Sequence, residues 1–401
     1  MFLILNCGSS SLKFKLFNLE DKLIADGNFS NIGSTNSEVK YNTYVGNALK
    51  FKKRIRIDCV EQAIKILENI LISEQYGVIN NFNEINVIGH RIVHGGDKYT
   101  EPIEYNKEVY KYLNQFSEFN LTHFKNAIDV VNICEHDFNN CHNLLVFDTS
   151  FHSTIPRKNY IYPLPLSLTE KYNIRKYGFH GISYSYVLKK YECITDNQKP
   201  NVILCHLGGG SSICAVKDGK SYDTTMGLTP NSGLLMSSRC GDLDPLLSAY
   251  LLEKENMSFL EIYNLLNEQS GYLSIAGTKD AKEIADRCNL KDEKALLTKE
   301  IISENFKKNL LSMMSSYFQL DSIVLTGGMG SKNAYIREAL LIGLDYFGIK
   351  LDKIKNKETL NKVGIISEQD SKIKIYVIPT DEEFEIYEEC KRKILNNKYY
   401  K

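Results

Sequence analysis

The two halves of the chain open with the same pattern of apolar and polar residues. Near the start, the apolar run 2–5 leads into a Cys-Gly-Ser-Ser-Ser turn and then a segment that alternates between apolar and polar positions up to Phe17. About 200 residues later, the apolar run 201–205 leads into Gly208-Gly-Gly-Ser-Ser212 and a second apolar run. Short apolar runs bounded by turn residues are typical of strands. The repeat predicts two related halves, each beginning with two strands around a glycine turn.

The rest of the chain mixes strand patterns with helix patterns. An Asp-Gly pair at 218–219 predicts a hairpin. Other segments have apolar residues at three- and four-residue spacing, which is typical of helices. We expect strands at 143–147, 322–325 and 373–377, and helices at 60–71, 293–318, 335–341 and from Thr380 onward. Strands interleaved with helices predict an α/β fold.

Charge and composition exclude several classes of protein. The 401 residues carry 49 basic and 49 acidic side chains, so we expect no nucleic-acid partner. No apolar run approaches the roughly 20 residues that span a bilayer, and the apolar stretch at the start is too short for a signal peptide. The ten cysteines include no Cys-x-x-Cys pair, which disfavours a zinc site or a disulfide framework. These features indicate a cytoplasmic enzyme or ATPase.

Three glycine-rich turns follow apolar strands and are candidate phosphate sites. They lie at Gly8–Ser11, Gly208–Ser212 and Gly327–Ser331. A turn without side chains lets backbone amides approach phosphate oxygens. None of the three has the spacing of a Walker loop or of a dinucleotide fingerprint in the required strand–helix setting. Each turn by itself has a structural alternative, but the three together indicate a phosphate ligand.

Several polar residues near strand ends have both a structural and a functional interpretation. Asn6 and Lys13 flank the first turn, and Lys13 is either a solvent-facing strand residue or a point charge for phosphate. Asp148 either caps its neighbours or lies at the carboxyl edge of a sheet, where it would hold a magnesium ion. Glu382 is either part of a capping box at Thr380-Asp-Glu-Glu383 or a functional acid.

Two segments place arginine and histidine between glycines. Residues 89–96 read Gly-His-Arg-Ile-Val-His-Gly-Gly, and residues 177–181 read Tyr-Gly-Phe-His-Gly. His90 and His94 have i, i+4 spacing, but the flanking glycines disfavour the helix that a shared metal ion would need. Arg239 lies in a predicted turn and is either solvated or paired with an anion. We expect core positions rather than catalytic roles for His90, His94, His136, His142 and His152.

Seven motifs resemble, in order and spacing, the acetokinase family, whose members are acetate and propionate kinases. They are Asn6-x-Gly-Ser-Ser-Ser-x-Lys13, Gly89-His-Arg-x-Val-His-Gly-Gly96, Val146-Phe-Asp-Thr149, Tyr177-Gly-Phe-His-Gly181, His206-Leu-Gly208, Arg239-x-Gly-Asp-x-Asp-Pro245 and Ile378-Pro-Thr-x-Glu-Glu383. The match runs from residue 1 to about residue 390. It implies reversible transfer of a phosphoryl group from ATP to a short carboxylate.

The resemblance also implies a fold and an assembly. The implied fold is α/β, with two duplicated domains of the sugar kinase/Hsp70/actin (ribonuclease H-like) superfamily and an active-site cleft between the domains. The implied assembly is a homodimer. We expect a first actin-like domain at 1–150 and a second, carrying the nucleotide segments, at 151–381. The segment 156–165 is the expected link, and a C-terminal helix at about 382–401 is expected to pack back on the first domain. No membrane partner is implied.

By position, the resemblance implies roles for individual residues. Asn6 and Glu382 resemble the family's magnesium site, which manganese would also fit. Lys13 resembles its phosphate-binding lysine, Arg91 its substrate-carboxylate ligand and Asp148 its essential acid. His180 and Arg239 resemble the pair that stabilises the transferring phosphoryl group. The implied ATP/ADP-binding residues are His206, Leu207, Gly208, Gly209, Gly210, Asp280, Ala281, Lys282, Gly328, Met329, Gly330, Ser331 and Lys332, and the implied acyl pocket is Val93, Phe179 and Pro230.

The implied chemistry is mainly electrostatic. A short carboxylate is ionised at neutral pH, so the nucleophile needs no general base, and its difficulty is repulsion from the γ-phosphate. Arginines, a histidine, a lysine and magnesium supply the charge that phosphoryl transfer requires. We therefore expect Asp148 to organise a metal ion or its water shell rather than to act as a base.

Several segments depart from the family pattern. His123-Phe-Lys125 stands where His-Asn-Pro is usual, Thr122 replaces a leucine and Gly209 replaces an asparagine. The adenosine segments read Asp280-Ala-Lys282 and Gly328-Met-Gly-Ser-Lys332. The donor therefore stays open among ATP, another nucleotide and pyrophosphate, and the acceptor between acetate and propionate. A non-kinase ATP-gated protein and a binding paralogue without turnover are the remaining alternatives.

Overall fold

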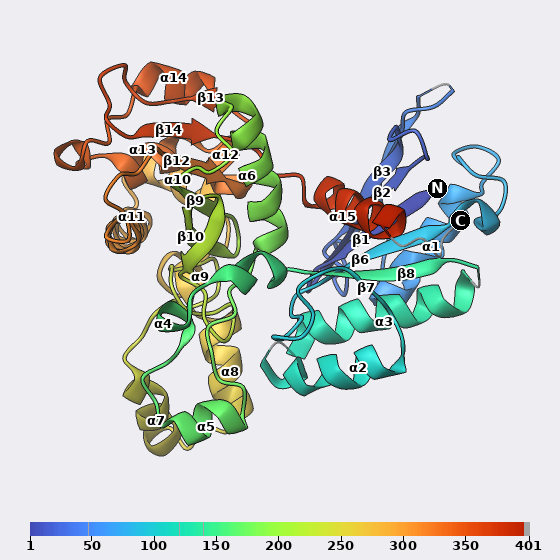
Figure 1. The fold of residues 1–401 in the computed structure, drawn as a ribbon, viewed down its shortest axis with the longest axis horizontal. Coiled ribbons are helices and arrows are strands. Elements are labelled where there is room, and N and C mark those ends of the chain that lie inside the picture. Colours follow the sequence, from blue (N-terminus) through green and yellow to red (C-terminus); the bar gives the residue numbers. More distant parts are fainter. Residues whose placement is uncertain (47, 120, 139, 397–401) are drawn as a thin grey trace. The chain divides into compact units, whose positions relative to one another are not determined.

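The computed structural model describes residues 1–46, 48–119, 121–138 and 140–396, without the side chains of 118–123. The chain forms two compact units, drawn in Figure 1. Unit 1 consists of Met1–Ser150 together with the segment from Asp381 onward, and unit 2 consists of Phe151–Thr380.

The segment 156–165 lies inside unit 2, so its assignment as the link is wrong. Two of its three prolines, Pro156 and Pro165, instead directly precede the short helices α4 (Arg157–Tyr160) and α5 (Leu166–Lys171), where the fixed φ of proline suits the helix start.

Unit 1 is built on an eight-stranded sheet in the order β5-β4-β3-β2-β1-β6-β8-β7. The central strands β1, β6 and β8 are parallel, and the other neighbours pair antiparallel. The strands are β1 (Phe2–Cys7), β2 (Ser11–Phe17), β3 (Leu23–Ser30), β4 (Glu38–Thr43), β5 (Lys50–Arg54), β6 (Val87–Ile92), β7 (Ile103–Glu104) and β8 (His142–Phe147).

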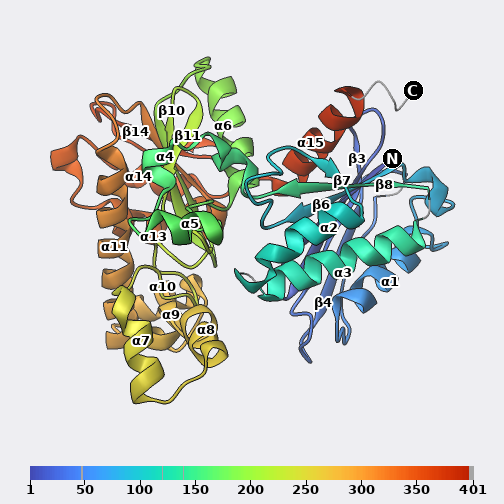
Figure 2. The same cartoon turned by 60° about the horizontal axis from the view of Figure 1, so that its bottom comes forward.

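Helices cover both faces of this sheet. They are α1 (Val60–Leu71), α2 (Lys107–Leu113), α3 (Leu121–Asp137) and α15 (Glu382–Asn396). Figure 2 shows α1 and α3 side by side, and Leu3 and Leu5 of β1 join their apolar core. The alternate residue Phe2 contacts Tyr387 of α15, because successive side chains of a strand point to opposite faces.

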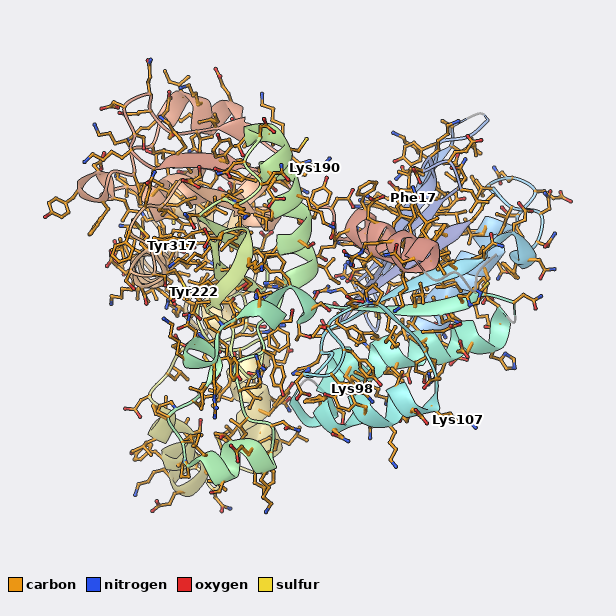
Figure 3. All side chains as sticks on the ribbon, viewed as in Figure 1. Phe17, Lys98, Lys107, Lys190, Tyr222 and Tyr317 are labelled. Atoms are coloured by element: carbon orange, nitrogen blue, oxygen red, sulfur yellow. The ribbon has the colours of Figure 1, made fainter. Side chains whose placement is uncertain are left out.

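The C-terminal helix α15 lies directly on the central strands. Phe17 of β2, labelled in Figure 3, stacks on Tyr387 with ring centroids 4.3 Å apart. A Cβ atom at Gly89 of β6 would come within 2.8 Å of the Cys390 sulfur, so only glycine allows the helix this close. The last helix of the chain is therefore part of the core of unit 1.

Unit 2 contains a six-stranded sheet in the order β11-β10-β9-β12-β14-β13. Its strands are β9 (Val202–Leu207), β10 (Ser211–Lys217), β11 (Lys220–Thr224), β12 (Ser322–Thr326), β13 (Gly364–Ile365) and β14 (Lys374–Val377). The helices, besides α4 and α5, are α6 (Gly181–Thr195), α7 (Pro245–Lys254), α8 (Phe259–Glu268), α9 (Gly271–Ala276), α10 (Ala281–Asn289), α11 (Glu293–Met314), α12 (Gly327–Lys332), α13 (Ala334–Leu341) and α14 (Lys353–Glu358).

Alternate residues of β9 enter two different cores. Leu204 packs in a cluster with Val187 of α6, whereas Ile203 packs in a cluster with Phe306 of α11. Tyr317, just beyond α11, donates its hydroxyl to the backbone carbonyls of Val202 and Val216 at 2.9 and 2.8 Å (Figure 3). The sheet of unit 2 is thus buried on both faces.

The two sheets share one pairing pattern. β1 pairs antiparallel with β2 and parallel with β6, which pairs parallel with β8. β9 likewise pairs antiparallel with β10 and parallel with β12, which pairs parallel with β14. The prediction of an α/β fold with duplicated halves is confirmed.

Three local predictions are wrong. The glycine run 327–331 forms helix α12 rather than an open turn, because Gly327 alone makes the bend, at φ +76 against the Leu207 backbone. Helix α11 ends at Met314, before the predicted end at Phe318. At the start of α15, Asp381 rather than Thr380 caps the helix, accepting from the Phe384 amide at 3.0 Å.

Candidate active site

Three neighbouring strands of unit 1 end at one edge of the sheet in polar residues. Asn6 and Arg91 are the second-last residues of β1 and β6, and Asp148 follows β8. Leu5 pairs with His90 in the parallel register, which places Asn6 beside Arg91. Carboxyl ends of parallel strands meet at one edge, where ligands of α/β sheets bind.

The Arg91 guanidinium bridges the other two residues. Its Nε lies 3.2 Å from both Asp148 oxygens, and its Nη2 lies 2.7 Å from Oδ2. Its Nη1 donates to Asn6 Oδ1 at 3.0 Å. A guanidinium has five N–H groups, so one on each terminal nitrogen donates no hydrogen bond within the described part of the chain. The side chain is 18% exposed, against 2% for Asp148.

Burial and charge act against each other in this pair. Burial raises the pKa of the Asp148 carboxyl, and the Arg91 guanidinium opposes that shift. Burial also disfavours the Arg91 charge, but the carboxylates of Asp148 and Glu382 outweigh it and raise the pKa of Arg91. Arg91 is therefore a permanent cation, held in place by a buried acid.

The first turn of α15 adds two acids from the far end of the chain. The Asn6 amide nitrogen donates to Glu382 at 3.0 Å and to Glu383 at 2.6 Å. Arg91 Nη1 lies 3.6 Å from Glu382, and Lys13 Nζ lies 3.9 Å from Glu383. Glu383 was not singled out from the sequence as a site residue, although it adjoins Glu382 in the same motif.

This cluster has the donor chemistry of a magnesium site. Three carboxylates, Asp148, Glu382 and Glu383, face the cations Arg91 and half-exposed Lys13. Among the described residues, no three His, Cys, Asp or Glu side chains form a ready metal cage. Magnesium, however, usually binds through one or two carboxylates, with water and substrate phosphates as its other ligands. The residues present therefore fit the ion.

A second cluster lies in unit 2, around the glycine turn between β9 and β10. His180 precedes α6 in the left-handed conformation, at φ 60, and its Nδ1 lies 2.9 Å from Ser212 Oγ. A Cβ atom on Gly210 would lie 3.3 Å from His180 Nε2 and 3.4 Å from Arg239 Nη1. Histidine and arginine nitrogens thus meet at a turn whose backbone carries no side chain, an arrangement suited to an anion.

Neighbouring groups fix the orientation of these side chains. His206 stacks on His180 at 4.2 Å, and its Nδ1 lies 2.8 Å from Ser183 Oγ. Arg239 Nη1 donates to the Pro230 carbonyl at 3.0 Å. Phe179, directly before His180, is buried. Phe179 and Pro230 of the predicted acyl pocket therefore adjoin this cluster, whereas Val93 is a buried residue of unit 1.

The buried histidines have structural roles. His152 Nε2 lies 2.9 Å from the Phe179 carbonyl and its Nδ1 lies 2.8 Å from Ser221 Oγ, and burial lowers its pKa to about 4. Burial also lowers the pKa of His90 to about 4 and that of His94 to about 3, so all three are neutral at pH 7. The core prediction is wrong for His136, which is exposed, and for His142, which is partly exposed.

A cavity of about 600 Å³ in unit 2 is lined by most of the predicted nucleotide residues. Those lining it are Gly208, Gly209, Asp280, Ala281, Lys282, Gly328, Met329 and Lys332. Five predicted residues do not line it: His206, Leu207, Gly210, Gly330 and Ser331. His206 stacks on His180, Leu207 is buried in the core and Gly210 adjoins Arg239. Gly330 and Ser331 form hydrogen bonds within the fold. Lining residues absent from the prediction include Tyr272, Lys279, Asn289, Asn333, Tyr335 and Leu360.

A buried arginine supports one wall of this cavity. The Arg337 side chain of α13 is fully buried and donates to the carbonyls of Gly330, Asn356 and Thr359 at 2.6 to 3.0 Å, and to Asn356 Oδ1 at 2.7 Å. It has no carboxylate partner within 4 Å among the described residues. Burial lowers its pKa to about 10, so it stays charged at neutral pH. In the sequence, Arg337 is only one residue of the predicted helix 335–341, and nothing there indicated that it would be buried and support the cavity.

Comparison with known proteins identifies the family. The acetokinase family matches residues 1–388. This chain belongs to the acetokinase family. The acetate kinase of Acetivibrio thermocellus is 40% identical over 400 residues, covering 98% of this chain and 99% of that protein.

Two solved structures extend the family relationship to the fold. A propionate kinase from Francisella tularensis is 36% identical, with a TM-score of 0.89 over 97% of this chain and 98% of that one. An acetate kinase from Porphyromonas gingivalis is 32% identical, with a TM-score of 0.85 over 98% of each chain. The sequence-based prediction of the acetokinase family is confirmed.

Within the described residues, no helix has both the length and the apolar character needed to cross a bilayer.

Three of the residues that depart from the acetokinase pattern are consecutive. The side chains of Thr122 and His123 are not among those that the structure describes. The third residue, Phe124, is buried in the core beside β8.

Proposed function

We propose that this acetokinase-family chain transfers a phosphoryl group reversibly from ATP to acetate, giving acetyl phosphate and ADP. The observation that carries this proposal is the state of Arg91. Its Nε edge is held by Asp148, while one N–H on each terminal nitrogen makes no hydrogen bond among the described residues, although Nη1 also lies 3.6 Å from Glu382. Two N–H groups on one planar guanidinium match the two oxygens of a carboxylate.

In this proposal, charges offset the repulsion between two anions. Arg91 orients the carboxylate, and Asp148 keeps the guanidinium from rotating. His180 and Arg239 stabilise the charge on the transferring phosphoryl group, and Lys13 binds phosphate as a point charge. Asn6 and Glu382 would hold magnesium or manganese, which offsets phosphate charge when bound.

Acyl phosphate trapping tests the proposal. Purified protein with ATP, acetate, magnesium and hydroxylamine is expected to form acetohydroxamate at a rate that depends on protein, acetate and magnesium. Steady hydrolysis of ATP without hydroxamate, from either acetate or propionate, would favour the ATP-gated alternative. A protein with neither activity would be a binding paralogue.

Propionate is the second candidate acceptor, because one of the similar structures is a propionate kinase. One methylene is worth roughly 1–3 kcal/mol in pocket discrimination, or about 10- to 200-fold. Initial rates over a range of both acids give the two kcat/KM values. We expect acetate to have the higher value, and a propionate-to-acetate ratio above one would reverse the assignment.

We also propose that the protein is a homodimer. Large apolar side chains are exposed on α7, α8 and the segment around α5, including Leu246, Tyr250, Phe259 and Leu166. Helices α7 and α8 contact each other within unit 2. Contiguous exposed apolar surface is typical of a protein interface. Sedimentation equilibrium at micromolar concentration is expected to give twice the chain mass of 45.8 kDa, and a single 45.8 kDa species would exclude the dimer.

A further inference from the structure

The cavity of about 600 Å³ has two kinds of lining. Gly208, Gly209 and Gly328 contribute backbone without side chains, as phosphate oxygens require. Side chains of α10, of α12 and of the start of α13, together with Tyr272 of α9, Lys279 and Leu360, contribute the remainder. The volume falls within the roughly 300–1,000 Å³ of sites for small organic ligands.

Two tyrosines supply the aromatic surface of the cavity. Tyr272 is 1% exposed, and its hydroxyl donates to the Leu235 carbonyl at 3.2 Å, so its ring belongs to the core. Tyr335, the second residue of α13, is 37% exposed and lines the cavity. Only Tyr335, among the described lining residues, offers a partly exposed ring.

The position of the Tyr335 ring is limited by α10. The Tyr335 hydroxyl neighbours the Cys288 thiol of α10, and burial together with that thiol raises the pKa of Tyr335. Ala281 and Ala285 of α10 also line the cavity, and residues four apart lie on one face of a helix. These two alanines leave room for a flat group in the cavity lined by the ring, although Lys282, Asp286 and Asn289 of the same helix also line it.

We propose that Tyr335 stacks on the heteroaromatic base of the phosphoryl donor and thereby selects a nucleoside triphosphate over pyrophosphate. This inference rests on the proposed kinase function and identifies its donor. Aromatic stacking accepts any base, but a purine offers more surface than a pyrimidine. Pyrophosphate has no flat apolar face and would gain nothing from the ring.

The test compares Tyr335→Ala and Tyr335→Phe with a surface control, Tyr346→Ala. Tyr346 is 93% exposed and does not line the cavity. We expect Tyr335→Ala to raise the KM for ATP about 5- to 150-fold, the range given by loss of one base–aromatic stack. The KM for acetate should change less than twofold, and Tyr335→Phe and Tyr346→Ala should resemble the wild type.

Donor preference provides a second measurement that a purely structural role would not change. The wild type should use ATP and GTP with lower KM than CTP and UTP, and Tyr335→Ala should reduce that difference. An unchanged KM for ATP in Tyr335→Ala, or a wild type that prefers pyrophosphate, would overturn the inference. Both results leave acetohydroxamate formation intact, whereas failure of the proposed function removes hydroxamate from the wild type with every donor.

Discussion

Replacing Arg91 with alanine is expected to lower kcat/KM for acetate about 100- to 10,000-fold. Two charge-assisted hydrogen bonds to the substrate carboxylate are lost, each worth roughly 1.5–3 kcal/mol. Arg91→Lys should recover only part of the activity, because a lysine cannot bind both oxygens with one planar group. Initial rates of hydroxamate formation with acetate as the varied substrate measure the effect.

The control must separate lost substrate binding from a destabilised fold. Arg91→Ala leaves the buried Asp148 carboxylate without its cation, which by itself costs stability. The double variant Arg91→Ala/Asp148→Asn removes that unpaired charge, so its melting temperature should rise towards the wild type while activity stays low. Arg56→Ala, at an exposed ion pair with Asp58, should retain full activity. Near-normal kcat/KM for acetate in Arg91→Ala would contradict the proposed role of Arg91.

Replacing Arg337 with methionine is expected to destabilise unit 2 by about 3–5 kcal/mol. The variant keeps most of the side-chain volume but leaves the Gly330, Asn356 and Thr359 carbonyls buried without their donor. Each kcal/mol lost lowers the melting temperature of a unit of this size by about 2–4 °C, so the melting temperature should fall by roughly 10 °C. Differential scanning calorimetry measures the shift.

The matched control is Arg157→Met at an exposed position of the same unit. Surface substitutions of this kind usually change stability by less than about 0.5 kcal/mol, so its melting temperature should equal that of the wild type. If Arg337→Met melted within 2 °C of the wild type, the buried hydrogen bonds of Arg337 would not support the cavity wall.

Local patterns predicted much of the fold. Helix α1 has the predicted bounds, Val60–Leu71, because its apolar residues recur on one face. The first two strands and the β9–β10 pair also form where alternation and glycine turns predicted them. The glycine run of α12 was misjudged because glycine disfavours a helix without excluding one, and contact with Leu207 decides between a helix and a turn.

The sequence by itself determined the α/β class, the strand–glycine turn–strand unit that opens each half and the family, since these depend on residues close together in the chain or on motifs with fixed spacing. The tertiary structure alone decided which distant residues meet. Asn6 contacts Glu382 across 376 positions, and Tyr335 and Gly208 line one cavity although they lie in different elements. Such contacts depend on how whole helices pack on a sheet, where burial and close approach, as at Gly89 beneath α15, outweigh any local preference.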